Sequence, residues 1–125
     1  MLTKPRVKIC CIKNFEEAQL AIHYGASAIG LVGHMPSGPG VIPDVRIKKI
    51  VEKTPPPIST FLLTSENTAG NIIKHYNKIN STTIQLVDSL VEGDYREIKA
   101  ALPAVTLVQV IHVTDQTSID EAIKI

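Results

Sequence analysis

Short apolar runs alternate with amphipathic stretches along the whole chain. The apolar runs have the length of single β-strands and fall at residues 7–12, 28–33, 58–64, 82–87 and 105–113. They are apolar at both odd and even positions, which is typical of strands covered on both faces. Because the runs recur at near-regular intervals with helix-like segments between them, the pattern predicts an α/β protein with a parallel sheet and helical crossovers.

The segments between the apolar runs carry helix signals. Asn14 followed by Glu17 has the spacing of a capping box, and Gly25 suits a helix exit, so a helix is expected over residues 14–24. Pro43 is expected to open the next helix. The later apolar helix faces comprise Ile47, Ile50 and Val51; Ala69, Ile72, Ile73 and Tyr76; Tyr95, Ile98 and Leu102; and Ile119, Ala122 and Ile123 after a start at Ser118 and Glu121.

Two architectures are compatible with five consecutive βα units. One is an open, flavodoxin-like sheet with strand order 2-1-3-4-5, which would make the chain a non-catalytic binding module. The other is the N-terminal part of a (β/α)₈ barrel, whose strands run in sequential order. The last predicted helix stops after about two turns without a capping residue. We therefore expect residues 1–125 to form one partial barrel domain, cut before its remaining strands.

Composition and charge exclude several classes of partner. Hydrophobic residues make up 44% and charged residues 20% of the 125 positions, as in ordinary soluble globular proteins. Thirteen basic residues against twelve acidic ones give a net charge of +1, so no nucleic-acid or membrane partner is expected. No apolar run approaches the ~20 residues that cross a bilayer, and no secretory apolar region opens the chain. The expected compartment is the cytoplasm.

The two cysteines, Cys10 and Cys11, are adjacent in the first apolar run. Neighbours on a strand point to opposite faces, so we expect no disulfide between them and expect Cys11 to face the helices as a packing residue. No Cys and His spacing of the zinc-site type is present, so no metal site is predicted.

Polar or reactive residues stand at the end of every predicted strand, which is where active sites of parallel α/β proteins lie. No glycine-rich nucleotide motif follows any strand, and no acidic cluster follows the first one. His23 and His75 fall inside predicted helices and are interpreted as ordinary helix residues. The strand-end residues are Cys10, Cys11, His34, Thr64, Ser65, Asp88, His112 and Thr114.

A family resemblance is carried by motifs in collinear order along the whole chain. The opening motifs are Val7-Lys8-Ile9-Cys10, Asn14-x-x-Glu17-Ala18 and Gly25-Ala26-x-Ala28-x-Gly30, and the later ones are Pro36-Ser37, Phe61, Gln85-Leu86 and Val110-Ile111-His112-Val113. With these motifs the chain resembles phosphoribosylanthranilate isomerases.

The resemblance implies a fold, a reaction and a set of site residues. It implies a (β/α)₈ barrel that converts N-(5-phosphoribosyl)anthranilate to 1-(2-carboxyphenylamino)-1-deoxyribulose 5-phosphate in tryptophan biosynthesis, an Amadori rearrangement without metal or organic cofactor. An aspartic acid opens the sugar ring and a cysteine thiolate removes the C2′ proton. Cys10 would be the catalytic base, and the expected phosphosugar-binding residues are Lys8, His34, Gln85, Asp88 and His112.

Lys8 and Cys10 are two residues apart on a predicted strand, so both are expected to point to the barrel interior. A free thiol is mostly protonated at neutral pH, and the Lys8 ammonium would favour the thiolate that a base requires.

The chain also departs from the family pattern. The usual Ser-Pro-Arg is Ser37-Gly38-Pro39-Gly40 here, Asp88 and His112 replace a glycine and an arginine, and Cys11 stands where glycine is common. The general acid and the phosphate site would fall beyond Ile125. We therefore expect little or no activity from residues 1–125 alone and self-association through open sheet edges. A barrel enzyme acting on another phosphosugar remains an alternative.

Overall fold

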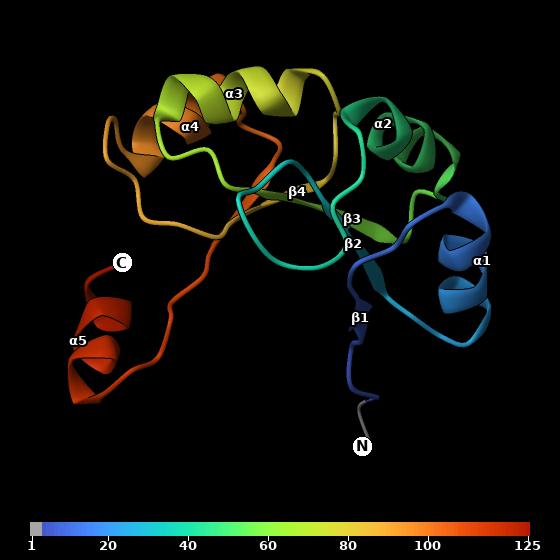
Figure 1. The fold of residues 1–125 in the computed structure, drawn as a ribbon, viewed down its shortest axis with the longest axis horizontal. Helices are drawn as coiled ribbons and strands as arrows, with labels where there is room; N and C mark the ends of the chain where they lie inside the picture. Colours follow the sequence, from blue (N-terminus) through green and yellow to red (C-terminus); the bar gives the residue numbers. More distant parts are fainter. Residues whose placement is uncertain (1–3) are drawn as a thin grey trace.

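A computed structural model describes residues 4–125 of the chain. Helices and strands alternate throughout this range (Figure 1). In chain order they are β1 Lys8–Ile9, α1 Phe15–His23, β2 Ala28–Val32, α2 Asp44–Lys53, β3 Ser59–Thr64, α3 Ala69–Asn77, β4 Thr83–Leu86, α4 Tyr95–Ala101, β5 Thr106–Gln109 and α5 Gln116–Lys124.

The strands form one sheet in the order β1-β2-β3-β4-β5, and all four pairings are parallel. Each strand therefore pairs with its neighbours in sequence, as in a barrel and unlike the 2-1-3-4-5 order of a flavodoxin-like module. The barrel-type prediction is confirmed and the flavodoxin-like alternative is wrong. Among the described residues the sheet stays open, with β1 and β5 at its two edges.

The strands all lie within the predicted apolar runs and are shorter than them, most of all the first and the last. β1 ends at Ile9, so Cys10 and Cys11 follow the strand instead of belonging to it. The backbone of Cys11 adopts a positive φ of 59°, which a regular strand cannot accommodate. Just beyond this bend, the Ile12 amide donates to the Gly30 carbonyl at 3.1 Å, so the chain still follows β2.

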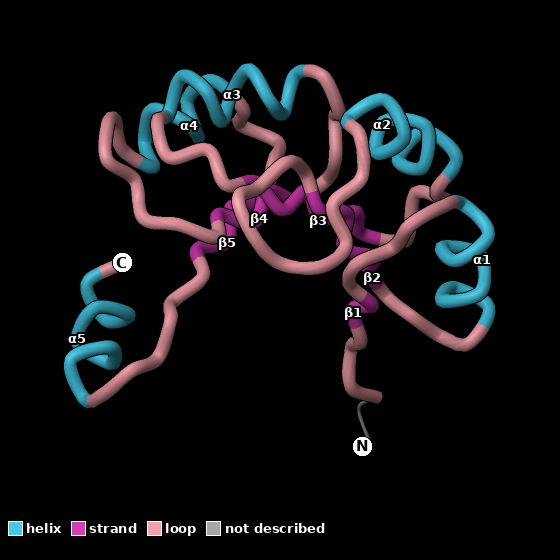
Figure 2. The backbone as a smooth tube through the Cα atoms, viewed as in Figure 1, coloured by secondary structure: helices cyan, strands magenta, loops and turns pink. Residues whose placement is uncertain are grey.

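Helices α1 to α4 lie along one side of the sheet, as Figures 1 and 2 show. Their apolar faces pack on alternate strand residues in two clusters, and this burial is the main stabilising force of the fold. The first cluster joins α1 and α2 to β2 and β3 through Ala18, Ile47, Ile50, Ile29, Leu31 and Leu62. The second joins α3 and α4 to β4 through Ala69, Ile72, Ile98, Ile84 and Leu86.

The helix starts follow the predicted capping chemistry with one shift. The Asn14 Oδ1 atom accepts from the Glu17 amide at 2.8 Å, and the Glu17 carboxylate accepts from the Lys13 amide at 2.9 Å. At α5 the capping residue is Asp115, with Ser118 as its partner in a capping box, so the helix begins at Gln116 and not at Ser118 as predicted. The Asp115 carboxylate reaches the Thr117 amide at 2.9 Å, which extends the helix toward its N-terminus.

Helix α5 stands apart from α3 and α4, beyond the β5 edge of the sheet (Figure 1). Its apolar face is uncovered: Ile119 is 50% exposed and Ile123 is 77% exposed. In the described part of the chain no helix is long and apolar enough to cross a bilayer.

Candidate active site

Alternate residues of the strands point away from α1 to α4, and we call this side of the sheet the inner face. Leu62 and Ile84 pack toward the helices, so their neighbours Phe61 and Gln85 belong to the opposite side. A hollow of about 360 Å³ lies over this side, lined among others by Lys8, Phe61 and Thr83. The inner face is where a barrel places its interior side chains.

Lys8 crosses the inner face from β1 to β4. Its Nζ atom donates to Gln85 Oε1 at 2.6 Å and lies 4.6 Å from the centre of the Phe61 ring. The hydrogen bond to an ionised donor and the cation–π contact both hold the ammonium in place. Phe61 was not among the predicted site residues, although the resemblance includes it.

Cys10 lies on the inner face next to Gly30. A Cβ atom built on Gly30 would come within 2.7 Å of the Cys10 sulfur, so this glycine leaves the space that the thiol occupies. Gly30 is in register with Phe61, whose ring carries the Lys8 ammonium, so the Cys10 sulfur and Lys8 lie on the same face. This is the orientation that the Lys8–Cys10 spacing predicted. Cys10 is half-buried.

Cys11 does not pack against the helices, and that prediction is wrong. Strand alternation does not apply to it because β1 ends at Ile9 and φ of Cys11 is 59°. Its sulfur lies 3.7 Å from the Pro39 carbonyl oxygen, and a Cβ atom on Gly40 would come within 2.8 Å of that sulfur. Cys11 therefore contacts the loop that follows β2.

The pKa of Cys11 lies above its ordinary value of 9.0. Burial is the largest cause, followed by the negative charge of the Cys10 thiolate and a hydrogen bond between the two thiols; Lys8 acts in the opposite direction. Cys11 therefore keeps its proton at neutral pH.

The remaining predicted residues lie apart from Lys8, Cys10 and Gln85. His34 is exposed and lines a small polar cleft with Asp44, separate from the hollow over the inner face. Asp88 is exposed just after β4, and its carbonyl oxygen accepts from Gln109 Nε2 at 3.2 Å. His112 lies beyond the end of β5, with Nε2 2.8 Å from the Val87 carbonyl oxygen.

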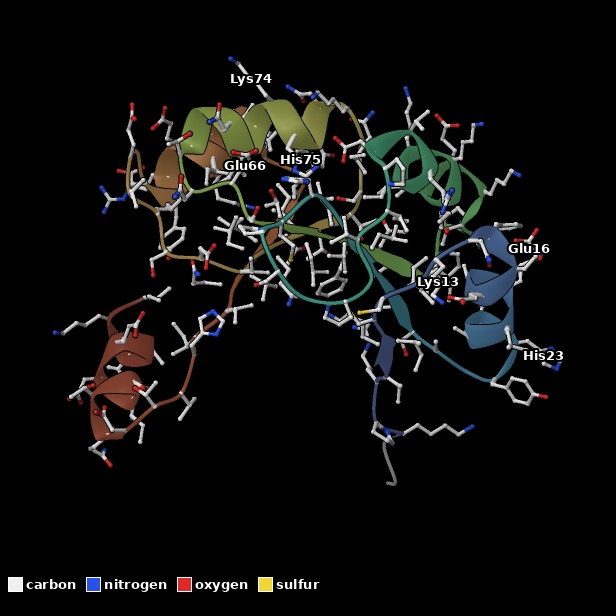
Figure 3. All side chains as sticks on the ribbon, in the orientation of Figure 1. Lys13, Glu16, His23, Glu66, Lys74 and His75 are labelled. Atoms are coloured by element: carbon white, nitrogen blue, oxygen red, sulfur yellow. The ribbon has the colours of Figure 1, made fainter. Side chains whose placement is uncertain are left out.

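His75 is not the ordinary helix residue that its sequence position predicts. Its Nδ1 atom lies 2.8 Å from Thr64 Oγ1 at the end of β3, and its Nε2 atom lies 2.9 Å from Asp44 Oδ1 at the start of α2. Figure 3 shows the ring on the side of α3 that faces the sheet, whereas His23 points outward from α1. Helical spacing could have indicated that His75 is buried, because it lies between Ile72 and Ile79, which are both buried.

This buried network is structural. Thr64 is 1% exposed, and its hydroxyl also accepts from the Glu66 amide at 3.2 Å. The network joins β3, α3 and the start of α2 at the carboxyl edge of the sheet. Across residues 4–125, no group of three or more His, Cys, Asp or Glu side chains is placed to hold a metal ion.

A sequentially ordered parallel sheet with helices outside is the arrangement of (β/α)-barrel proteins. Two curated relatives identify the family among the barrel proteins. The chain is 30% identical over 117 residues to an N-(5′-phosphoribosyl)anthranilate isomerase of Methanocella arvoryzae, covering 94% of this chain and 55% of the relative. It is 31% identical over 109 residues to isomerase 2 of Methanosarcina mazei, covering 86% of this chain and 48% of the relative. The chain is a divergent relative of the phosphoribosylanthranilate isomerases.

Solved structures agree on the fold. Phosphoribosylanthranilate isomerase of Thermotoga maritima matches with a TM-score of 0.78 at 20% identity, covering 97% of this chain and 57% of that one. An isomerase bound to reduced 1-(o-carboxyphenylamino)-1-deoxyribulose 5-phosphate matches with the same TM-score at 21% identity, covering 97% and 60%.

No family model matches the chain. The chain spans about half the length of the curated relatives it matches. This agrees with an open sheet of five strands in place of a closed barrel.

Proposed function

We propose that this chain carries the base-bearing part of a phosphoribosylanthranilate isomerase site. The reaction is the Amadori rearrangement of N-(5-phosphoribosyl)anthranilate to 1-(2-carboxyphenylamino)-1-deoxyribulose 5-phosphate, and Cys10 is its base. The observation that carries the proposal is the placement of the Cys10 sulfur beside Gly30 on the inner face, directly after β1. The likeness to isomerases at 30% and 31% identity supports it.

The chemistry assigns one proton transfer to these residues. The Cys10 thiolate takes the C2′ proton of the ring-opened Schiff base, which leaves an enolamine that tautomerises to the ketone. The Lys8 ammonium adds positive charge to the same face, where it attracts an anionic substrate. Gln85 and Phe61 position Lys8 for this role. The acid that protonates the ring oxygen is expected from a further strand.

The test joins these residues to further barrel strands from a relative. Residues 1–125 are fused to the remaining strands of the Methanocella arvoryzae isomerase, and turnover of N-(5-phosphoribosyl)anthranilate is measured in the chimera. We expect Cys10→Ser to abolish turnover and Cys11→Ser, the matched control one residue away, to retain most of it. Full turnover in the Cys10→Ser chimera would disprove the role of Cys10 as base.

The 125-residue chain alone is expected to show little or no turnover. Its inner face is open to water, and a general base and acid act efficiently only when held together in a site that excludes solvent.

We expect a cytoplasmic protein that associates with a second copy of itself. The open β1 and β5 edges and the exposed Ile123 side chain would form the contact. Light scattering at several protein concentrations measures this; a strictly monomeric chain at high concentration would contradict it.

A second candidate is the isomerisation of a different phosphosugar. The loop from Gly33 to Pro43 contains no lysine or arginine that could bind an anthranilate carboxylate, and His34 turns toward a separate cleft. In the same chimera, a substrate lacking the carboxylate would then turn over faster than phosphoribosylanthranilate. Equal or slower turnover would favour the anthranilate substrate.

A further inference from the structure

Cys10 and Cys11 form a pair of thiols whose chemistry the proposed base role does not use. Both are free and half-buried at the carboxyl end of β1. Each sulfur occupies a space that a glycine leaves: Gly30 beside Cys10 and Gly40 beside Cys11. The two sulfurs are therefore held between the β2 strand and the loop after it.

The backbone at Cys11 does not keep the two side chains on opposite faces of a strand. Adjacent residues of a regular strand would point to opposite faces. Here Cys11 is in the left-handed region, with φ of 59°, so that alternation is broken at the junction between the two residues. The two thiols are neighbours in the chain, and Cys10 is among the groups that raise the pKa of Cys11.

We propose that Cys10 and Cys11 are a peroxide-sensitive dithiol that closes into an intramolecular disulfide between adjacent residues. This assigns a modification site to the pair. Its effect on activity rests on the proposed function, because the disulfide consumes the thiol that acts as base.

The reaction balances with a peroxide as the oxidant. The Cys10 thiolate attacks one peroxide oxygen, the O–O bond breaks, and Cys10 becomes a sulfenic acid while hydroxide leaves and is protonated to water. The Cys11 sulfur then attacks the Cys10 sulfur, so that an S–S bond forms, the S–O bond breaks and a second water leaves with the Cys11 proton. The two thiols lose two electrons, and the peroxide gains them.

The roles of the two thiols differ. Cys10 lies on the same face of the sheet as Lys8 and is assigned as the thiol that attacks the peroxide, whereas Cys11, one residue further along the chain, loses its proton as it attacks the sulfenic acid. A resolving thiol next to the oxidised one outcompetes further oxidation, since no diffusion separates the two.

The disulfide is expected to be easily reduced. Adjacent Cα atoms are about 3.8 Å apart across a trans peptide. Ordinary disulfides join Cα atoms roughly 4.4–6.8 Å apart, and departures from this range strain the bond and favour its reduction. Strained disulfides are the labile and regulatory ones, so the modification should reverse in mild thiol reductant.

The test treats the whole chain with stoichiometric hydrogen peroxide and measures free thiols and mass. We expect both thiols to disappear, the tryptic peptide of residues 9–13 to lose two hydrogen atoms in mass, and dithiothreitol to restore both thiols. Circular dichroism before and after treatment checks that the chain stays folded. These readouts do not depend on turnover, so they stand even if Cys10 is no base.

Matched variants identify the order of events. In Cys11→Ser we expect a sulfenic acid at Cys10 that a sulfenic-acid-specific reagent traps, and in Cys10→Ser we expect slower oxidation. Persistence of both thiols in the wild-type chain, a sulfinic acid at Cys10 in the wild-type chain, or disulfide-linked dimers in place of the intramolecular bond would each overturn the proposal.

Discussion

Lys8 Nζ donates a 2.6 Å hydrogen bond to Gln85 Oε1, and this contact joins β1 to β4 across two intervening strands. No ladder hydrogen bond connects those two strands. The contact therefore links two strands that do not pair with each other and holds the ammonium over the inner face.

Lys8 and Gln85 are expected to be energetically coupled. Replacing Lys8 by Met or Gln85 by Leu removes the same hydrogen bond, so the double variant should lose less stability than the two single variants together. A hydrogen bond to a charged group contributes about 1.5–3 kcal/mol, and partial exposure of Lys8 places the coupling near the lower end. Urea unfolding of the four proteins gives the coupling energy, and strictly additive effects would show that the contact does not form in solution.

Gly30 is expected to tolerate no side chain. A Cβ atom there would lie 2.7 Å from the Cys10 sulfur and 3.1 Å from the Cys10 Cα atom, so the backbone of residue 10 must move. We expect Gly30→Ala to destabilise the chain by about 1–3 kcal/mol, as overpacking does.

A matched glycine provides the control for this substitution. Gly70 lies in α3, and a Cβ atom added there would have no other atom within 4 Å, so alanine meets open space. Gly70→Ala should stabilise the helix by about 0.5–1 kcal/mol. Chemical denaturation measures both variants, and a neutral or stabilising Gly30→Ala would refute the packing of Cys10 against Gly30.

The His75 network is expected to stabilise the carboxyl edge of the sheet. His75→Ala removes one hydrogen-bond partner from the buried Thr64 hydroxyl and the partner of the Asp44 carboxylate. Such a loss costs about 1–3 kcal/mol. His23→Ala, on an exposed histidine of α1, should change stability by less than about 0.5 kcal/mol. Similar melting temperatures for the two variants would contradict the structural role of His75.

The reactivity of Cys11 with pH tests its raised pKa. Because burial and Cys10 both raise the pKa above 9.0, alkylation of Cys11 should reach half its maximal rate above that pH. Cys10→Ser removes the charge and the hydrogen bond, so the midpoint should move down while burial keeps it above 9.0.

The same pKa shift has a consequence for stability. The fold favours the protonated thiol of Cys11, so its contribution to stability is present below the unfolded pKa and is lost as the pH rises through the folded pKa. Mass spectrometry of the alkylated peptide follows the pH midpoint of Cys11 alkylation. Identical pH profiles in the wild-type chain and in Cys10→Ser would show that the two thiols do not interact.

The sequence predicted the sheet because burial patterns and capping chemistry are local. Asn14 and Glu17 mark the start of α1 by their spacing alone, and the βα alternation predicts parallel strands, although it leaves the sequential and the 2-1-3-4-5 orders open. The same local reasoning placed Lys8 and Cys10 on one face correctly.

The parts of the site that the sequence did not predict depend on contacts between distant segments. The backbone at Cys11 bends out of the strand where it meets the loop at Pro39, which strand alternation cannot anticipate. The partners of His75, Thr64 and Asp44, come from two other elements. Helical spacing could have marked His75 as buried, but could not have named those partners.

The pairing of each strand with its neighbour in sequence has a consequence for how the chain folds as it is synthesised. Every strand after the first can add to an edge that is already present, without waiting for a later segment of the chain. The sheet can therefore grow during translation one βα unit at a time, from the amino terminus onward. At each stage the newest strand is the growing edge, which must be shielded until the following unit emerges from the ribosome.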